Sequence, residues 1–266
     1  MYMTKEQLEE LEFYHKNFHA PVTLDAIVRT KETKMRQTIF SKTVTKQWEM
    51  FDLAAKHLNR ISLWGPPGIG KTFGACALRN HGETLSVTLS EDIVAQELMG
   101  HYIPKGNEFV WHDGPVTTAV RNGYNVVVNE LGRASAAVKD MFLGVLDNPD
   151  VCKLTMPTGE VVSPKDSFKV IATSNSGPEE LDPALADRFE TVIHVQGPHP
   201  ELVDIFEKHL AGLGEAIMNS YSGSEPISCR SALTLVILTQ KGVGMEDAAK
   251  IAFGPKASVV ARLAKG

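Results

Sequence analysis

The residues best suited to chemistry lie in the run Gly-Pro-Pro-Gly-Ile-Gly-Lys-Thr, from Gly65 to Thr72. The run satisfies the pattern G-x-x-x-x-G-K-[ST], with an apolar segment before it and a segment of helical character after it. Glycines allow a tight turn in which backbone N–H groups face an anion. Lys71 would reach the outer phosphates of a nucleotide, and the Thr72 hydroxyl would ligate Mg²⁺. The sequence therefore predicts a nucleotide phosphate site.

We expect the whole loop and the residue after it to surround the phosphates. The helix that opens near Gly70 adds its N-terminal dipole to the backbone donors. An alternative is a glycine turn that precedes a helix by coincidence, which the combination of strand, loop, Lys-Thr and helix disfavours. The predicted nucleotide-binding residues are Gly65, Pro66, Pro67, Gly68, Ile69, Gly70, Lys71, Thr72 and Phe73.

Polar side chains also follow two other predicted strands. Glu130 comes directly after the apolar strand 124–129, and Asn175 follows the strand 168–173. In a parallel sheet, the carboxyl ends of the strands form the site. Glu130 could act as a general base that orients and deprotonates a water for attack on the γ-phosphate, and Asn175 could hold the same water. The alternatives are a solvent-facing Glu130 and an Asn175 that serves only a turn.

The elements that must position these residues alternate between strand and helix patterns as far as residue 195. Strands are predicted at 61–64, 84–89, 124–129, 168–173 and 190–195. Helices are predicted at 47–58, 92–99, 115–121, 135–147 and 181–188. Residues 101–114 are expected to form an inserted loop or hairpin, and residues 152–162 a β-hairpin.

The sequence Gly-Pro-His-Pro at 197–200 gives the strongest boundary signal in the chain. Beyond it only helical patterns occur, at 201–220, 228–240, 245–253 and 256–264. Alternating strands and helices followed by helices alone predict an α/β domain with a five-stranded parallel sheet and then a small all-helical domain.

Composition narrows the classes of function. The chain has 266 residues, 43% of them apolar and 22% charged, as in ordinary globular proteins. Its net charge of −5 argues against nucleic-acid binding over the whole surface. No apolar run is long enough to span a membrane, and the polar N-terminal residues are unlike a secretory signal. Because the cysteines are few and far apart, we expect neither disulfides nor structural zinc, and a cytoplasmic protein.

The N-terminal part is predicted to hold an amphipathic helix at 6–18, followed by a basic stretch at 28–46. Lys and Arg dominate this stretch, although the whole chain is acidic. It is either a solvated connector or a contact to an acidic partner, a neighbouring subunit or nucleic acid.

From about Trp48 onward, the chain resembles the MoxR-like branch of the AAA+ ATPases, a group of dynein-related AAA-type domains. The matching segments follow the family's order: 65–72 for Walker A, 124–134 for Walker B, 168–175 for sensor 1, 181–189 for the arginine-finger segment and 228–233 for the sensor 2 helix. The resemblance implies a P-loop NTPase fold with an AAA+ core and a helical lid. The implied division is an N-terminal helix and basic connector at 1–45, the core at 46–197 and the lid at 198–266.

The resemblance also implies ATP and Mg²⁺ as cofactors and a role for each matching residue. Lys71 and Thr72 would bind phosphate and Mg²⁺. Glu130 would polarise the attacking water, and Asn175 would position it.

Two arginines complete the set of residues that the resemblance implies. Arg230 would reach the γ-phosphate from the lid, and Arg188 would act on the nucleotide of a neighbouring subunit. A guanidinium supplied in this way meets charge that develops in the transition state. The alternatives are a surface ion pair of Arg188 with Asp182 or Asp187, and an Arg230 that only lies on the surface at a helix start.

Asn129 departs from the family pattern, because it stands where the family has the Walker B Asp. An Asp brings negative charge near Mg²⁺, usually through the water shell of the metal, and an amide brings none. We expect Asn129 and Thr72 to lie at the metal site. Nucleotide binding should survive, with lowered Mg²⁺ affinity, so we expect slow ATP hydrolysis rather than binding alone.

The resemblance implies an Mg-ATP-dependent ATPase that forms a homo-oligomeric ring, expected to be hexameric, and remodels or activates a protein partner. In this branch the partner is often a von Willebrand factor A-domain protein. One alternative is a nucleotide-gated assembly module with little turnover. A second, less favoured alternative is a nucleic-acid-directed AAA+ protein that uses the basic stretch. No membrane partner is expected.

Overall fold

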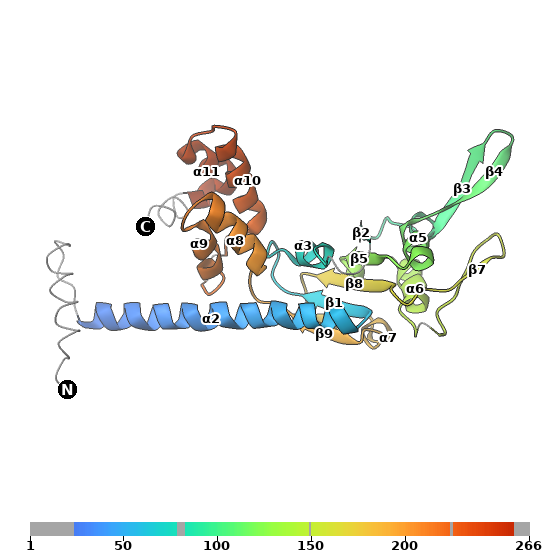
Figure 1. Ribbon diagram of the computed structural model, residues 1–266, viewed down its shortest axis with the longest axis horizontal. Coiled ribbons are helices and arrows are strands. Elements are labelled where there is room, and N and C mark those ends of the chain that lie inside the picture. The colour runs from blue at the N-terminus through green and yellow to red at the C-terminus, as the bar shows by residue number, and fades with distance from the viewer. Residues whose placement is uncertain (1–23, 79–82, 149, 224–225, 258–266) are drawn as a thin grey trace. The chain divides into compact units, whose positions relative to one another are not determined.

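The computed structural model describes residues 24–78, 83–148, 150–223 and 226–257 (Figure 1). The predicted helix at 6–18 and nearly all of the one at 256–264 lie outside these ranges. The chain divides into two compact units, Met1–Thr43 and Val44–Gly266. The sheet, the phosphate loop and the C-terminal helices all belong to the second unit.

Helix α2 spans Leu24–His57, so it begins well before the predicted Gln47. The basic stretch at 28–46, predicted as a solvated connector or a partner contact, is therefore helical. The segment between Pro21 and Gly65 contains neither Gly nor Pro and is rich in Lys, Arg, Gln and Glu, which favour a helix without an apolar stripe. Within the second unit, α2 buries one face. Its buried residues are Val44, Trp48, Phe51 and Ala55, spaced three or four residues apart.

The central sheet has five parallel strands in the order β2-β5-β8-β1-β9, which confirms the predicted fold class (Figure 1). Their bounds are Arg60–Trp64 for β1, Thr84–Thr88 for β2, Asn125–Asn129 for β5, Lys169–Ser174 for β8 and Thr191–His194 for β9. Every residue of β5 is buried. A strand that is apolar on both faces is expected in a parallel sheet with covered faces.

Helices between the strands bury the sheet. They are α3 (Lys71–Cys76), α4 (Ala95–Met99), α5 (Pro115–Asn122), α6 (Ala136–Val145) and α7 (Pro183–Ala186). The core of this domain joins Val116 and Val120 of α5, Phe142 of α6, and Val126 and Val170 of the sheet. These side chains are fully or almost fully buried, so they fix how α5 and α6 pack on the sheet.

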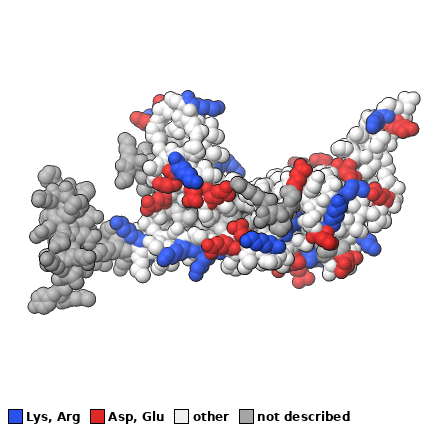
Figure 2. Space-filling model, in the orientation of Figure 1, with Lys and Arg blue, Asp and Glu red and all other residues white. Residues whose placement is uncertain are grey.

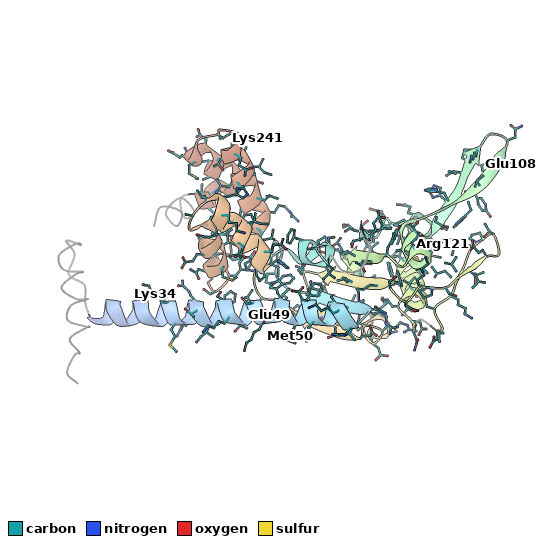
Figure 3. The ribbon with its side chains drawn as sticks, in the orientation of Figure 1. Lys34, Glu49, Met50, Glu108, Arg121 and Lys241 are labelled. Atoms are coloured by element: carbon teal, nitrogen blue, oxygen red, sulfur yellow. The ribbon has the colours of Figure 1, made fainter. Side chains whose placement is uncertain are left out.

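Two antiparallel hairpins extend from this core, as predicted. The first pairs β3 (Gly100–Lys105) with β4 (Glu108–Asp113), and the second pairs β6 (Leu154–Thr155) with β7 (Val161–Val162). Arg121 of α5 joins them: its Nε lies 2.8 Å from Asp113 Oδ2, and its Nη1 lies 2.5 Å from Glu160 Oε1. Figure 3 shows Arg121 at the base of the first hairpin and Glu108 near its tip. A cavity of about 670 Å³ lies between the hairpins, away from the phosphate loop.

Beyond β9 the described chain is helical, as predicted. The helices are α8 (Pro200–His209), α9 (Leu213–Ser220), α10 (Cys229–Gln240) and α11 (Met245–Phe253). They share a separate core that includes Phe206, Ile217, Ala232 and Leu235. The C-terminal helices therefore pack around a core of their own within the second unit.

The single helix predicted at 201–220 is wrong, because the chain breaks between α8 and α9. Gly212 adopts the left-handed φ of 79° immediately before α9. The Glu207 carboxylate accepts hydrogen bonds from the backbone N–H groups of Gly212, at 2.7 Å, and Glu215, at 3.3 Å. It therefore satisfies donors that a helix start leaves unpaired. Apolar periodicity does not reveal such a break.

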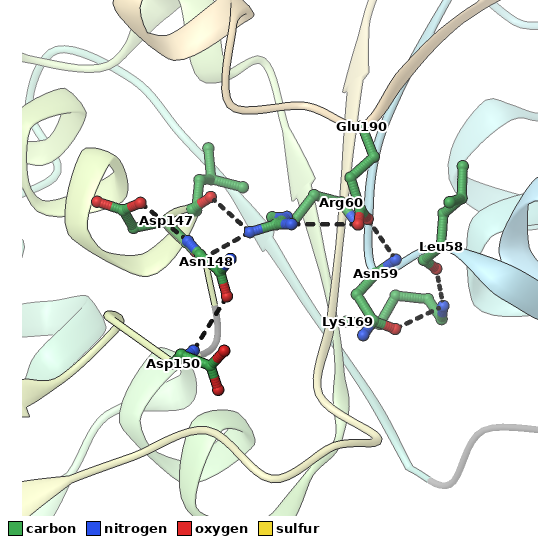
Figure 4. Close-up of polar contacts among 9 residues, drawn as sticks. Leu58, Asn59, Arg60, Asp147, Asn148, Asp150, Lys169 and Glu190 are labelled. Atoms are coloured by element: carbon green, nitrogen blue, oxygen red, sulfur yellow. Dashed lines mark hydrogen bonds and ion pairs between the residues drawn. The ribbon is translucent and has the colours of Figure 1, made fainter.

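A polar network ties β1, β8 and β9 together at their amino ends (Figure 4). Glu190 Oε2 accepts hydrogen bonds from the backbone N–H groups of Asn59, at 2.7 Å, and Arg60, at 2.8 Å. Arg60 Nη1 donates to the Asp147 carbonyl at 2.7 Å, next to the end of α6. Lys169 Nζ donates to the Leu58 carbonyl and to Asn59 Oδ1. Burial raises the pKa of Glu190, but these donors outweigh burial and hold its pKa below the usual 4.5.

We predict that Glu190→Ala lowers the free energy of unfolding by about 1 kcal/mol, because two backbone donors lose their acceptor and solvent partly screens the site. A carboxylate with a lowered folded-state pKa stabilises the protein fully above pH 4.5, and this contribution is lost as the pH falls through the lowered pKa. Urea unfolding at several pH values tests this. The control is Glu91→Ala, at an exposed position. A stability difference that does not shrink in acid would contradict the prediction.

Candidate functional site

The register of the sheet brings three strand ends together. Strand β8 lies between β1 and β5, with Trp64 opposite Ser174 and Asn129 opposite Thr173. The strands therefore stop at nearly the same level, and the residues that follow them share one edge of the sheet. This is the edge at which open α/β sheets place their ligands.

Two glycines shape the phosphate loop between β1 and α3. Gly68 has a φ of 76° and Gly70 a φ of 92°, both in the left-handed region that glycine tolerates best. A Cβ at Gly68 would lie 2.3 Å from the Ser228 hydroxyl oxygen, and one at Gly70 would lie 2.5 Å from Leu202 Cδ1. The loop therefore needs glycine both for its backbone and for its contact with the helical domain.

Lys71 is buried under the loop. Its Nζ donates to the carbonyls of Gly65 and Pro66, both at 2.8 Å, and to Asn175 Oδ1 at 2.9 Å. Burial lowers the pKa of Lys71 to about 8, and the carboxylate of Glu130 partly opposes this shift. The ammonium is thus held by neutral oxygens that phosphate oxygens can replace.

Asn175 links this lysine to Glu130, because its Nδ2 donates to Glu130 Oε1 at 2.7 Å. Glu130 has a φ of 60° and a ψ of 42°, and it is the only non-glycine residue with positive φ in the described part of the chain. Such backbone geometry is costly and is concentrated at functional sites. Arg133 lies 3.8 Å from Glu130 Oε2 but is largely exposed, so this ion pair is weak.

Asn129 and Thr72, the two residues predicted for a metal site, are in direct contact. Asn129 Oδ1 accepts hydrogen bonds from Thr72 Oγ1 and from Thr173 Oγ1, each at 2.7 Å. The Thr72 proton is therefore directed at the amide, which leaves the hydroxyl lone pairs for a cation. Thr173 was not among the predicted site residues, and only its position just before Ser174 and Asn175 at the strand end could have indicated it.

The helical domain contacts the phosphate loop at several points. The N–H of Cys229, at the start of α10, donates to the Gly68 carbonyl at 2.8 Å. The N–H of His199 donates to the Ile69 carbonyl at 2.9 Å, and the His199 ring packs edge-on against Phe73. Arg230 follows in the first turn of α10, where its side chain is exposed. The Arg230 backbone therefore lies next to the contact between Cys229 and Gly68, while its side chain faces solvent.

Arg188 lies apart from this cluster. Its Nη1 donates to the Ala184 carbonyl at 2.9 Å, and its Nη2 lies 3.9 Å from Asp147 Oδ2. The ion pair is thus formed with Asp147, and the alternative partners Asp182 and Asp187 were wrong. Asp182 instead caps α7 by accepting from the Ala184 N–H at 2.8 Å. Within its own chain, Arg188 does not join the residues around Lys71.

The donor set fits a nucleoside triphosphate with Mg²⁺. A buried ammonium and a glycine loop suit phosphate oxygens, and the hydroxyl and amide oxygens of Thr72 and Asn129 suit a hard cation. Glu130 supplies one carboxylate beside them. A nucleoside triphosphate with Mg²⁺ is therefore the class of ligand that these residues fit.

Comparison with known proteins agrees with this geometry. Residues 60–189 match the family model of the AAA domain, dynein-related subfamily. The chain is 33% identical to the protein NorQ of Paracoccus denitrificans (strain Pd 1222) over 146 residues, which cover 53% of this chain and 54% of NorQ. It is 35% identical to an uncharacterized protein of Staphylococcus aureus (strain USA300) over 157 residues, 55% of this chain and 57% of that protein. The chain thus spans about half the length of the curated relatives it matches.

Among solved structures, NtrX from Brucella abortus superposes with a TM-score of 0.52 and 19% identity. The superposition covers 73% of this chain and 49% of that chain. At this identity the likeness supports the fold alone.

The parallel sheet, the glycine loop before α3 and the helices docked on that loop define a P-loop nucleotide-binding protein with a C-terminal helical domain. The match over residues 60–189 makes the class more specific. Residues 60–189 thus match the AAA ATPase family, dynein-related subfamily, in agreement with the family inferred from the motifs.

We predict that Gly68→Ala weakens ATP binding by at least about tenfold, because the new methyl group strains a left-handed backbone and collides with Ser228 in the lid. The matched control is Gly106→Ala at the tip of the first hairpin. Gly106 also has a positive φ, of 66°, but a Cβ there would meet nothing within 4 Å. Titration with a fluorescent ATP analogue measures both variants. Equal losses in the two variants would show that the lid contact has no part in binding.

Proposed function

We propose that this protein hydrolyses ATP slowly as a ring-forming homo-oligomer and uses the cycle to remodel or activate a protein partner. The observation that carries the proposal is the hydrogen-bonded chain from Lys71 through Asn175 to Glu130. It joins the group that holds the outer phosphates to the carboxylate that activates water. The Asn175 amide sets the spacing between Lys71 and Glu130, because its oxygen bonds to one and its nitrogen to the other.

In this mechanism, the Lys71 ammonium and the loop N–H groups bind and orient the triphosphate. Glu130 accepts the proton of the attacking water, and Asn175 orients that water through its amide. Mg²⁺, held by Thr72, would supply charge neutralisation on the phosphates. Asn129 brings no charge to the metal site, which supports slow turnover.

Arg188 supports the proposal of an oligomer. It lies outside the cluster of its own chain, and an exposed carboxylate, Asp147, holds its guanidinium only loosely at 3.9 Å. We propose that it acts on the nucleotide of the neighbouring subunit and that Arg230 acts from the lid on its own. The hexameric state and a von Willebrand factor A-domain partner are proposals that rest on the family resemblance.

Two alternative functions are supported to different degrees by the structure. A nucleotide-gated assembly module would use the same contacts between Gly68, Ile69 and the lid without needing turnover. Nucleic-acid binding has less support. On the visible face of the described residues, acidic and basic side chains are interspersed (Figure 2), and a single-sign basic surface would be expected for a phosphate backbone.

The proposal also assigns a role to each segment of the chain and a cellular location to the protein. We propose that residues 46–197 carry the chemistry, that residues 198–266 act as the lid, and that residues 1–45 contact a partner or a neighbouring subunit. None of the described helices combines the length and apolar character needed to cross a membrane. The cytoplasmic location rests on the composition of the sequence.

We predict that Glu130→Gln reduces ATP-dependent phosphate release by about 10²-fold or more, to background for a slow enzyme, because the water loses its base. ATP binding and any ATP-dependent increase in size should remain, as measured by light scattering after size exclusion. Glu91→Gln, at an exposed position, serves as the control. Release that is equal in wild type and Glu130→Gln would favour the assembly module over the enzyme.

Complementation between two inactive variants tests the action of Arg188 in trans. Arg188→Ala keeps an intact phosphate site, and Lys71→Ala keeps an intact arginine. Each alone should hydrolyse ATP at background rates, whereas an equimolar mixture should regain activity at interfaces that pair one intact site with one intact arginine. A mixture no more active than the sum of its parts would place Arg188 outside the neighbouring site.

A further inference from the structure

We propose that Asn129 positions the Thr72 hydroxyl and that its contacts with strand β2 require an amide at this place. Because the amide is neutral, nucleotide binding depends only weakly on Mg²⁺. The inference rests on the proposed nucleotide site and goes beyond it. It assigns a role to the residue that departs from the family pattern. It also predicts a binding property that an acidic residue would not give.

Both the oxygen and the nitrogen of the Asn129 amide form hydrogen bonds. Its oxygen accepts from Thr72 and Thr173, each at 2.7 Å. Its nitrogen donates to Ser86 Oγ and to the Val87 carbonyl, both at 3.1 Å, on the neighbouring strand β2. An amide has two acceptor positions and two donor hydrogens, and here all four have partners. The residue is 8% exposed, so these bonds are largely sheltered from water.

The Val87 carbonyl decides which group fits this position. A backbone carbonyl only accepts hydrogen bonds, and the sheet fixes its direction. The Ser86 hydroxyl could turn and donate to a second oxygen, but Val87 could not. A carboxylate in place of Asn129 would hold an oxygen against this carbonyl at about the present 3.1 Å. The same contact fixes the orientation of the amide, since the reversed amide would put its oxygen there.

The amide acts on the metal site through Thr72. Because the Thr72 hydroxyl donates to Asn129, its lone pairs point elsewhere and are available to a cation. Thr173, which donates to the same oxygen, keeps that oxygen in place. Asn129 is therefore a positioning residue in this arrangement.

The charge balance of the cluster follows from the same geometry. Lys71 and Glu130, linked through Asn175, bring one positive and one negative charge. A second carboxylate would make the cluster acidic and would repel phosphate oxygens until a metal ion neutralised them. With Asn129 this repulsion is absent. The triphosphate should therefore bind almost as well without Mg²⁺ as with it.

The experiment compares wild type with Asn129→Asp, and uses Asn125→Asp as a matched control. Asn125 is buried at the other end of β5 and donates to Thr84 of the same neighbouring strand at 3.2 Å, so the control makes the same change away from the loop. Melting temperature is measured without nucleotide, and ATP affinity by calorimetry with Mg²⁺ and with EDTA. The wild-type affinity should change less than about tenfold between the two conditions.

In Asn129→Asp, removal of Mg²⁺ should weaken ATP binding by about tenfold more than in wild type. Its melting temperature should fall by at least about 2 °C. Asn125→Asp should also be destabilised but should keep the wild-type response to Mg²⁺. Asn129→Ala, which is neutral, should keep the weak response as well, so the test does not depend on the acidic variant folding.

Two results would overturn the inference. One is a wild-type protein whose ATP affinity collapses in EDTA as far as that of Asn129→Asp. The other is an Asn129→Asp protein that is as stable as wild type and that, in EDTA, binds ATP more tightly than wild type does. If wild type binds no ATP under either condition, the proposed nucleotide site fails and the metal dependence fails with it. If it binds ATP without hydrolysing it, only the proposed turnover fails.

Discussion

The pairing of β8 with both β1 and β5 is the constraint on which the rest of this molecule depends. It sets Trp64 level with Ser174 and Asn129 level with Thr173. A shift of the register by one residue would turn the side chains of a strand to the opposite face of the sheet. The phosphate loop, Glu130 and Asn175 would then no longer meet. The polar network around Glu190 and Lys169 holds the amino ends of the same strands and so supports this register from the other edge.

The helical domain is joined to the backbone of the phosphate loop by hydrogen bonds. Carbonyls of Gly68 and Ile69 accept hydrogen bonds from Cys229 and His199 of the helical domain. The two domains have separate cores, so each can keep its packing when the contact between them changes. Any change that a nucleotide made in the loop would reach the helical domain through these same bonds. This gives a physical route from binding to a change in the helical domain.

The site contains two groups whose placement costs free energy, a buried lysine and a glutamate with left-handed backbone angles. Lys71 is buried with a lowered pKa, and Glu130 has strained backbone angles. Both are held by Asn175, whose amide bonds to each. Asn129 is held just as completely by its neighbours on β2 and β8. The neutral residue thus belongs to the hydrogen-bonding pattern of the sheet.

The sequence by itself determined the phosphate loop, the five-strand α/β class, both hairpins and the helical domain, because these depend on local patterns such as glycine spacing and apolar periodicity. It also indicated Lys71 and Thr72 through the pattern of the glycine loop, and Glu130 and Asn175 because each follows a predicted strand. It did not show the early start of α2, the break at Gly212 or the partner of Arg188. Only the tertiary structure decided the contact of Asn129 with Val87 and the docking of Cys229 on Gly68. These contacts join residues far apart in the chain, and strand register and domain packing, which no local pattern encodes, bring them together.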